Sequence, residues 1–291
     1  MDVLTQIEMG KLVAPGSGEP LALAPGGDHL VGRNSGEMFD LLYGRVPILL
    51  RDAERAARYV EKSPQMLTEY EGASTSDSQA PASGKAENVY TAMATRALAN
   101  LLDPLPPTAF CLAVGGGPTR AHPRLCNLNI GPFQNVDVVG DAHELPYADE
   151  SVDAIYCSAV IEHLHTPDKA VQEMFRVLKP GCGVFSSSPF IFVYHGYPDH
   201  YQNYTLSGHR RLFERQGFTI AEDGVSTGPA YAITQLVDQF IFYYLTGFSR
   251  WAFKRMWRLA VPFIRRVDRD RKHIDKAYLM ASTTYVIALK P

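Results

Sequence analysis

The sequence of 291 residues has few cysteines, and they do not form a metal-binding pattern. Cys111, Cys126, Cys157 and Cys182 lack the paired spacing of a zinc site. Each falls in or beside an expected strand, so we interpret them as buried, reduced thiols of a cytosolic protein. The sequence also lacks a large excess of either charge. A net charge of −3 argues against a chain that coats nucleic acid as a whole, and we expect no nucleic-acid partner.

Long apolar stretches are missing as well. No uninterrupted apolar run is long enough to cross a bilayer. The segment from Met1 to Gly10 carries Asp2 and Glu8 and has no apolar core, unlike a secretory signal. We therefore expect a cytoplasmic protein. Its length suffices for one large or two modest domains with an ample core.

The stretch from Phe110 to Phe190 carries the strongest pattern. It opens with a short apolar run, Phe110 to Val114, that ends in three glycines and a proline. A buried strand followed by such a turn brings bare backbone close to a ligand in α/β sheets. The same pattern occurs in several kinds of nucleotide-binding fold, so the turn alone does not identify a family.

The later segments narrow the interpretation. They are Gly140-Asp141-Ala142-His143-Glu144-Leu145-Pro146, a strand over 152–157, and a helix over 168–178 that is followed by Lys179-Pro180-Gly181. In this order the segments resemble the class I S-adenosylmethionine-dependent methyltransferases. The resemblance implies an enzyme with an α/β, Rossmann-like, seven-stranded and mostly parallel sheet. It also implies S-adenosyl-L-methionine as the cofactor.

The resemblance also assigns cofactor-binding residues. The glycine turn would pass beneath the methionine moiety, with its backbone N–H groups available to the carboxylate. Asp141 and Ala142 match an adenine-edge motif, although Asp141 can instead cap the following turn. The full set is Gly115, Gly116, Gly117, Asn129, Asp141, Ala142, Ser158 and His163.

Three departures from the family pattern point to an alternative. Ala113 stands where an acidic residue commonly holds the amino end of the cofactor, and Asn129 stands where an acidic residue grips the ribose. Only twelve positions separate Gly117 from Asn129, too few for a full crossover helix. The alternative is a non-catalytic member of the fold, a scaffold or binding partner with a weakened cofactor site.

The segment 189–205 is rich in aromatics and histidines where the resembling enzymes place their acceptor. It resembles a subgroup that includes enzymes of glycan and secondary-metabolite pathways. This implies O-methylation of a hydroxyl on a sugar, glycan or other small metabolite. Because histidine is the natural base near neutral pH, His195 and His200 are candidate bases, with Asp199 as an orienting partner or alternative base. Their alternative role is to fix the wall of the cleft.

The same region also contains residue types that bind metals. His163 and His165 together with Asp199 offer a possible ligand set, but we expect no metal. The aromatic residues of the segment suit stacking on a sugar or planar ring, and loop packing explains them equally well.

The chain divides into three parts. Residues 1–62 resemble the small zinc-ribbon-like β module found with methyltransferases, with Ala14 and Ser17 at the positions of the first cysteine pair and the second pair absent near Asn34. Because ligands are missing, we expect this module to be metal-free. Residues 63–88 read as a flexible linker, and a helix is expected over 51–61. Residues 89–291 form the methyltransferase domain.

A helical insertion is expected at about 228–275, before a last strand over 278–289. Its second half, 250–272, mixes many arginines and lysines with Trp251, Phe253, Met256, Trp257 and Leu259. Such a helix can lie at the inner face of a membrane and attract anionic lipid or a lipid-linked acceptor. The alternative is a helical hairpin that packs on the sheet or forms a homodimer face.

Overall fold

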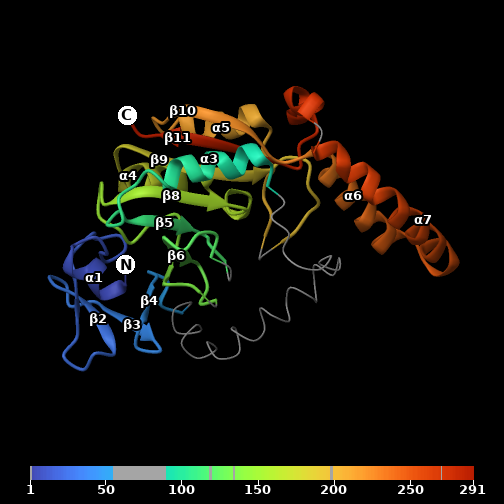
Figure 1. The fold of residues 1–291 in the computed structure, drawn as a ribbon. Helices are drawn as coiled ribbons and strands as arrows, with labels where there is room; N and C mark the ends of the chain where they lie inside the picture. The colour runs from blue at the N-terminus through green and yellow to red at the C-terminus, as the bar shows by residue number, and fades with distance from the viewer. Residues whose placement is uncertain (1, 55–89, 118–119, 134, 197–198, 270) are drawn as a thin grey trace.

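The computed structural model describes residues 2–54, 90–117, 120–133, 135–196, 199–269 and 271–291 (Figure 1). The expected linker over 63–88 lies outside the described residues, as does most of the helix expected over 51–61. The described strands form one 11-stranded sheet in the order β1-β2-β3-β4-β7-β6-β5-β8-β9-β11-β10.

The larger part of this sheet has seven strands. They are β5 (Cys111–Val114), β6 (Leu125–Asn129), β7 (Val138–Gly140), β8 (Val152–Ser158), β9 (Leu178–Pro189), β10 (Thr219–Thr227) and β11 (Thr283–Leu289). Strands β7, β6, β5, β8 and β9 are parallel neighbours, and β11 runs antiparallel between β9 and β10. The expected seven-stranded, mostly parallel α/β sheet is confirmed.

Both faces of the sheet are covered, because successive side chains of β5 point to opposite faces and all of them are apolar. Cys111 and Ala113 pack in one apolar cluster with residues of α3 (Ala92–Leu102). Leu112 and Val114 pack in the other with residues of α4 (Pro167–Val177) and α5 (Leu206–Glu214). The four residues of β5 are all buried, so the strand is a continuous apolar run rather than an alternating one.

The crossover connections differ in length. Within the described residues no helix follows β5 or β6, as the short spacing in the sequence predicts. The connection from β8 to α4 contains a short 3-10 helix, η1 (Ile161–His163). The glycine turn and η1 therefore lie on neighbouring strands at the carboxyl edge of the sheet, where α/β folds bind ligands.

The N-terminal module extends this sheet. It contains α1 (Val3–Glu8), β1 (Leu21–Leu23), β2 (His29–Gly32), β3 (Met38–Leu42) and β4 (Val46–Leu49). Its four strands form an antiparallel meander, and β4 then pairs in parallel with β7 through Ile48 and Val139. The backbone of Val13 also donates to the Pro146 carbonyl at 3.0 Å. The module is thus joined to the larger domain by backbone pairing.

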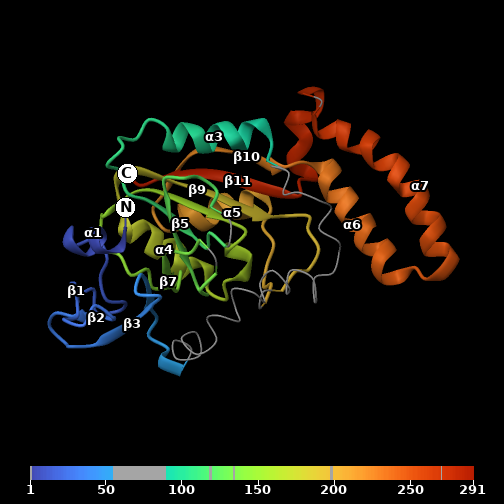
Figure 2. The ribbon, with the colours of Figure 1, turned by 60° about the horizontal axis from the view of Figure 1, so that its bottom comes forward.

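Two long helices form an arm that projects from the body (Figures 1 and 2). They are α6 (Pro229–Tyr244) and α7 (Gly247–Arg266), followed by the short 3-10 helices η2 (Val267–Arg269) and η3 (Arg271–Leu279). Helix α7 has no buried residue, so the packing of the insertion on the sheet, weighed as one alternative, is not what α7 does. The last strand begins at Thr283 rather than at Tyr278, because η3 occupies the intervening residues. None of the helices described is long and apolar enough to cross a bilayer.

Candidate functional site

The glycine turn after β5 is built into its surroundings. A Cβ on Gly115 would lie 2.2 Å from Cγ2 of Val160, and a Cβ on Gly116 would lie 2.3 Å from Oδ1 of Asn127. Both separations are far below van der Waals contact, so these two glycines are required by the protein's own packing. Gly117 differs, because a Cβ there would meet no atom of the described residues within 4 Å. The turn therefore packs tightly at its start and faces open space at its end.

Polar groups stand at the carboxyl ends of the strands beside this turn. Asn129 ends β6, is 8% exposed, and accepts a 3.2 Å hydrogen bond from the Gly131 backbone N–H through Oδ1. Ser158 ends β8, and its hydroxyl contacts the Tyr90 hydroxyl. Asp141 follows β7 directly. The residues expected at the cofactor site from the resemblance thus lie along one edge of four neighbouring strands.

Asp141 caps a turn. Its Oδ1 accepts from the backbone N–H of His143 at 2.8 Å and lies 2.7 Å from Nδ1 of the same imidazole. The Asp141 side chain is 40% exposed, whereas that of His143 is 11% exposed. The capping role weighed from the sequence is therefore present, and the exposed carboxylate remains at the edge of the sheet.

A cluster of hydroxyls lies beside Ala113. Ala113 pairs in register with Tyr156 on β8, and the Tyr156 hydroxyl lies 3.1 Å from that of Tyr90. The Tyr90 hydroxyl also contacts Ser158. Burial, with smaller effects from Tyr90, raises the pKa of Tyr156, so this group stays protonated. Where the resembling enzymes carry a carboxylate, this chain has an alanine with neutral hydroxyls beside it. Tyr90 and Tyr156 were not found from the sequence.

The second half of the site is a loop folded over η1. The Tyr201 backbone N–H donates to the Glu162 carbonyl at 2.8 Å. The Gln202 amide donates to the carbonyls of Ile161 and Leu164 at 2.9 and 2.8 Å. These contacts join residues some forty positions apart and hold the expected acceptor segment against the end of β8.

The structure brings the candidate bases together. The His195 and His200 rings lie 4.4 Å apart between centroids, and His163 lies 4.9 Å from His195. Nδ1 of His195 lies 3.0 Å from the Val193 carbonyl, and Nε2 of His200 lies 2.6 Å from Oδ1 of Asn203. Backbone and amide groups therefore orient these two rings.

Asp199 contributes differently from the orienting role expected. Its carboxylate accepts from the Tyr201 hydroxyl at 3.2 Å, and its backbone carbonyl lies 2.6 Å from Nδ1 of His163. His165 lies away from this group, with its ring 4.5 Å from that of His143. The histidine pair weighed as metal ligands from the sequence, His163 and His165, thus has separate surroundings.

Glu162 is the charged residue that sequence reasoning missed. Its side chain is fully buried, and neither carboxylate oxygen has a hydrogen-bond partner among the residues that the structure describes. Nε2 of His195 lies 3.7 Å and Nε2 of His163 lies 3.9 Å from Oε1 of Glu162. Burial lowers the pKa of His195, but interaction with Glu162 and the Val193 carbonyl outweighs it, so the pKa is raised. The pKa of His200 is lowered, chiefly by burial.

A separate hollow of about 610 Å³ lies at the opposite edge of the sheet. It is lined by residues at the beginning of β4 and by residues before β7. The lining includes Arg45, Arg120 and Asp137. Arg120 forms an ion pair with Asp137 at 2.8 Å there. Because this hollow lies at the amino ends of the strands, it is not part of the site described above.

Comparisons with known proteins agree with this geometry. Residues 122–185 match the family model described as a methyltransferase domain. A demethylmenaquinone methyltransferase of Renibacterium salmoninarum is 42% identical over 57 residues, which are 19% of this chain and 24% of that protein. A malonyl-[acyl-carrier protein] O-methyltransferase of Methylococcus capsulatus is 50% identical over 44 residues, 15% of this chain and 16% of that protein. The chain thus spans a quarter or less of the length of these relatives.

Among solved structures, the chain is similar to a complex of the Haloferax volcanii Trm112 methyltransferase activator with a methyltransferase. The TM-score is 0.43 at 17% identity, over 68% of this chain and 88% of that one. The fold class expected from the sequence is confirmed by the strand order and the family match. The match and relatives likewise bear out a methyltransferase domain with S-adenosylmethionine as its cofactor.

The described residues fit this cofactor. A Cβ on Gly117 would meet none of the described residues within 4 Å, which leaves a cradle that a side chain would fill. The turn ends at the same sheet edge as buried Asn129 and hydroxyl-bearing Ser158. The glycine turn leaves its backbone bare, as approach of a ligand to the chain requires. Asp141 offers a carboxylate at the same edge.

Proposed function

We propose that this chain transfers a methyl group from S-adenosylmethionine to a hydroxyl of a small acceptor, a sugar, glycan intermediate or other metabolite. The observation that carries the proposal is the edge formed by the ends of β5, β6, β7 and β8. There the glycine turn after β5 shares one sheet edge with Asn129, Asp141 and Ser158, which end or follow β6, β7 and β8. When bound, the sulfonium cofactor supplies both the methyl group and the leaving group.

In this proposal the chain holds the cofactor mainly through neutral groups. The amide of Asn129 can donate and accept hydrogen bonds, and the Ser158 hydroxyl can do the same. The hydroxyls of Tyr90 and Tyr156 take the place of the carboxylate that Ala113 lacks. Asp141 is the charged exception. Neutral hydrogen bonds are weaker than charge-assisted ones, so the affinity for cofactor should be modest.

The acceptor half would align the hydroxyl and receive its proton. His195 and His200 lie side by side in the loop that folds over η1, with their rings fixed by the contacts to Val193 and Asn203. Fixed rings favour alignment, which is the main catalytic demand of an in-line displacement. A histidine in its neutral form accepts the proton of the hydroxyl as the new bond forms.

The experiment that tests this function is a calorimetric titration of the full chain with S-adenosylmethionine and S-adenosylhomocysteine. We expect binding of both ligands at one site. Absence of binding up to millimolar concentration would favour the non-catalytic scaffold instead. Release of S-adenosylhomocysteine in the presence of hydroxylated acceptors then separates an enzyme from a binding protein.

We further propose that the arm contacts an anionic membrane surface. Between Pro229 and Arg266 the arm carries six arginines and lysines and a single acidic residue, Asp238. Asp238 already accepts from the Trp257 indole N–H at 2.8 Å. The cationic character of the arm contrasts with the net charge of −3 of the whole chain, so the arm is the part suited to anionic lipid.

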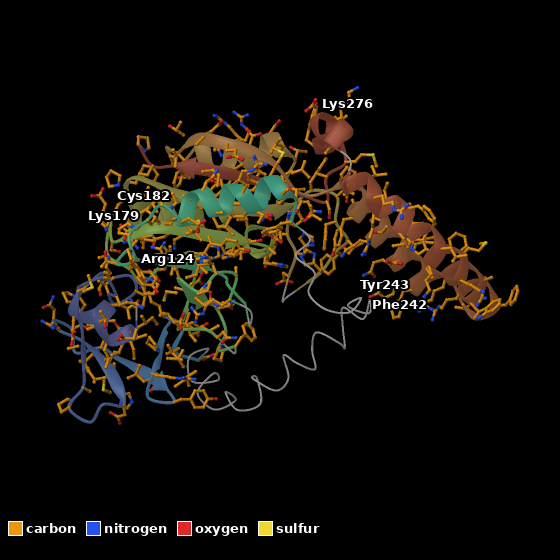
Figure 3. The ribbon with its side chains drawn as sticks, in the orientation of Figure 1. Arg124, Lys179, Cys182, Phe242, Tyr243 and Lys276 are labelled. Atoms are coloured by element: carbon orange, nitrogen blue, oxygen red, sulfur yellow. The ribbon has the colours of Figure 1, made fainter. Side chains whose placement is uncertain are left out.

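Hydrogen bonds hold both ends of α6, but many large apolar side chains of the arm remain exposed. Arg250 donates to the Leu245 carbonyl at 2.6 Å, and Asp268 accepts from the backbone of Ala230 at 2.8 Å, so both ends of α6 are held. The exposed apolar residues include Phe240, Tyr243, Tyr244, Phe248, Trp251, Met256, Leu259 and Phe263. Figure 3 shows Phe242 and Tyr243 on the arm, far from Cys182 on the sheet. Apolar and basic side chains on one helix pair suit a membrane interface.

The arm also begins at the edge that carries the site. Thr227, which precedes α6, pairs with Thr283, and Thr283 pairs with Pro189 at the carboxyl end of β9. A membrane under the arm would thus lie on the side of the sheet where the acceptor is expected. Sedimentation with vesicles that contain anionic lipid tests the contact, with neutral vesicles as the control. A dimer through the arm, measured by light scattering without lipid, is the outcome that would replace this proposal.

A further inference from the structure

We propose that Glu162, His163 and His195 bind a divalent transition-metal cation of the zinc type. The three residues offer one carboxylate oxygen and two imidazole nitrogens, and these atoms lie within 4.8 Å of one another. They come from two segments, η1 and the loop after β9, which meet at the carboxyl edge of the sheet. Neither the family match nor the relatives' names assign a metal to these residues.

The first argument is the buried carboxylate. Glu162 has no exposed side-chain surface, and its two oxygens have no hydrogen-bond donor among the residues described. A buried carboxylate without partners costs several kcal/mol, and proteins normally pair it or coordinate a metal with it. The Nε2 atoms of His195 and His163 are 3.7 and 3.9 Å away, beyond a direct hydrogen bond. The carboxylate of Glu162 is therefore too far from either imidazole for a direct hydrogen bond.

The width of the gap suits a bound ion. Zinc binds imidazole nitrogen and carboxylate oxygen at about 2.1 Å, so one ion can join ligand atoms up to about 4.2 Å apart. Both separations from Glu162 fall below this limit, and all three ligand atoms lie within 4.8 Å of one another. Small shifts of the rings would bring the two nitrogens and the oxygen to tetrahedral spacing around one cation.

The second argument is the orientation of the two rings. Nδ1 of His163 lies 2.6 Å from the backbone carbonyl of Asp199, and Nδ1 of His195 lies 3.0 Å from that of Val193. A carbonyl can only accept, so each Nδ1 carries the proton. In the neutral ring Nε2 then presents a bare lone pair toward Glu162. Histidines that bind metals are usually held in this way, by a second hydrogen bond from the other nitrogen.

The ligand set indicates the class of metal. Two imidazoles and a carboxylate suit zinc and related transition metals, whereas magnesium and calcium prefer oxygen ligands alone. Three protein ligands also leave a coordination position open, as in catalytic rather than structural zinc sites. His200 does not fill that position, because its Nε2 is bonded to Asn203. If the proposed methyl transfer is correct, the bound ion would hold the acceptor oxygen at the open position and make its proton more acidic, and His200 rather than His195 would receive that proton.

The test is metal binding by the untagged full chain, which does not depend on activity. Chelator-treated protein is titrated with Zn²⁺ against a chromophoric chelator, and with Co²⁺, whose visible spectrum reports the ligand geometry. We expect one ion per chain. His195→Ala, His163→Ala and Glu162→Gln should each weaken Zn²⁺ binding by about 100-fold or more, since each removes a ligand.

His165→Ala is the matched control, because His165 lies in the same segment but beside His143. It should bind Zn²⁺ as the unchanged chain does. Lack of Zn²⁺ and Co²⁺ binding by the folded chain would overturn the proposal, as would binding that all three ligand variants retain. Circular dichroism checks that each variant is folded. If Glu162→Gln does not fold, weaker Zn²⁺ binding by both His195→Ala and His163→Ala supports the site, and unchanged binding by both overturns it. Cofactor titration of the same samples separates loss of the metal from failure of the methyltransferase proposal.

Discussion

Gly115 and Val160 pack so closely that a single methyl group on the glycine would lie 2.2 Å from Cγ2 of the valine. Gly115 also has φ of +71°, a conformation that side chains other than hydrogen disfavour. The contact joins the turn after β5 to the segment after β8. The turn after β5 and the segment after β8 are therefore packed against each other at the edge that carries the proposed cofactor site.

Gly115→Ala should destabilise the fold. Overpacking and the left-handed backbone conformation together cost about 2–4 kcal/mol of unfolding free energy. Urea unfolding measures this cost, and Val160→Ala in the same chain should recover the overpacking part while the backbone part remains. Equal stability of Gly115→Ala and the unchanged chain would contradict the close packing.

Gly117→Ala separates stability from binding. Its φ is +61°, but its Cβ would meet no protein atom within 4 Å, so the expected cost in stability is only about 1–2 kcal/mol. Because the methyl group would occupy the space assigned to the cofactor, S-adenosylmethionine should bind at least tenfold more weakly by calorimetry. Unchanged affinity would remove the glycine turn from the proposed site.

Asp141→Asn tests the charged contact of the cofactor site. The amide oxygen can still accept from the His143 backbone, so the turn is kept. The negative charge is lost, and charge-assisted hydrogen bonds are about twice as strong as neutral ones. We expect about a tenfold loss of cofactor affinity. Asp149→Asn, an exposed carboxylate paired with Arg176, is the control and should leave affinity unchanged.

The parallel strands and the short connections could be predicted because they depend on local sequence. Continuous apolar runs such as 111–114 have no polar face to expose and fit only a buried strand. The spacing between Gly117 and Asn129 excludes a crossover helix by length alone. The joining of β4 to β7 has no such local signal, since it rests on backbone pairing of an edge.

The candidate site could be predicted only in part, because its contacts join residues that are far apart in the sequence. The histidines of the acceptor loop are visible in the sequence as residue types, but their partners are not. Glu162 becomes a buried carboxylate without a hydrogen-bond donor among the described residues only when Tyr201 and Gln202 hold the loop across η1. Tyr90 and Tyr156 reach Ser158 from different elements, so their cluster depends on the packing of the segment before α3 against β8.

His209 should make stability depend on pH. It is fully buried between Ser186 and Thr284, and burial lowers its pKa to about 3. In the unfolded chain the pKa is about 6.5, so between these values the unfolded state binds the extra proton. The free energy of unfolding should therefore fall as pH is lowered from 6.5 toward 3, by up to about 1.4 kcal/mol per pH unit.

Chemical unfolding at several pH values measures this slope. His209→Gln keeps a donor and an acceptor for the two hydroxyls but cannot be protonated, so its slope should be smaller in the same range. His122→Ala is the control for a histidine outside the core. A slope that is identical in the unchanged chain and in His209→Gln would show that other groups cause the acid sensitivity.

His200→Ala distinguishes a base from a wall residue. His200 lies beside His195 in the acceptor half, away from the glycine turn in sequence and element. Cofactor affinity should therefore be unchanged, whereas turnover with a hydroxyl acceptor should fall by about 100-fold or more, as loss of a general base does. Tyr194→Phe, which keeps the ring that stacks on His200 at 5.7 Å, is the control. Unchanged turnover in His200→Ala would assign it to the wall of the cleft.

The exposed apolar face of α7 should determine binding to anionic vesicles. Trp251 and Leu259 are 58% and 71% exposed, and Phe248 is 79% exposed. Replacing all three by serine removes apolar area worth about 1.5–3 kcal/mol per fully buried side chain, so vesicle affinity should fall at least tenfold. Met38→Ser, on the N-terminal module and 69% exposed, is the control and should bind as before. Arg255 and Arg266 lie over the rings of Trp251 and Phe263 and keep their positive charges beside the apolar face. Because salt screens the attraction between these charges and anionic lipid, raising the salt concentration should weaken the remaining binding. Equal sedimentation of the triple variant and the unchanged chain would show that the arm serves another contact.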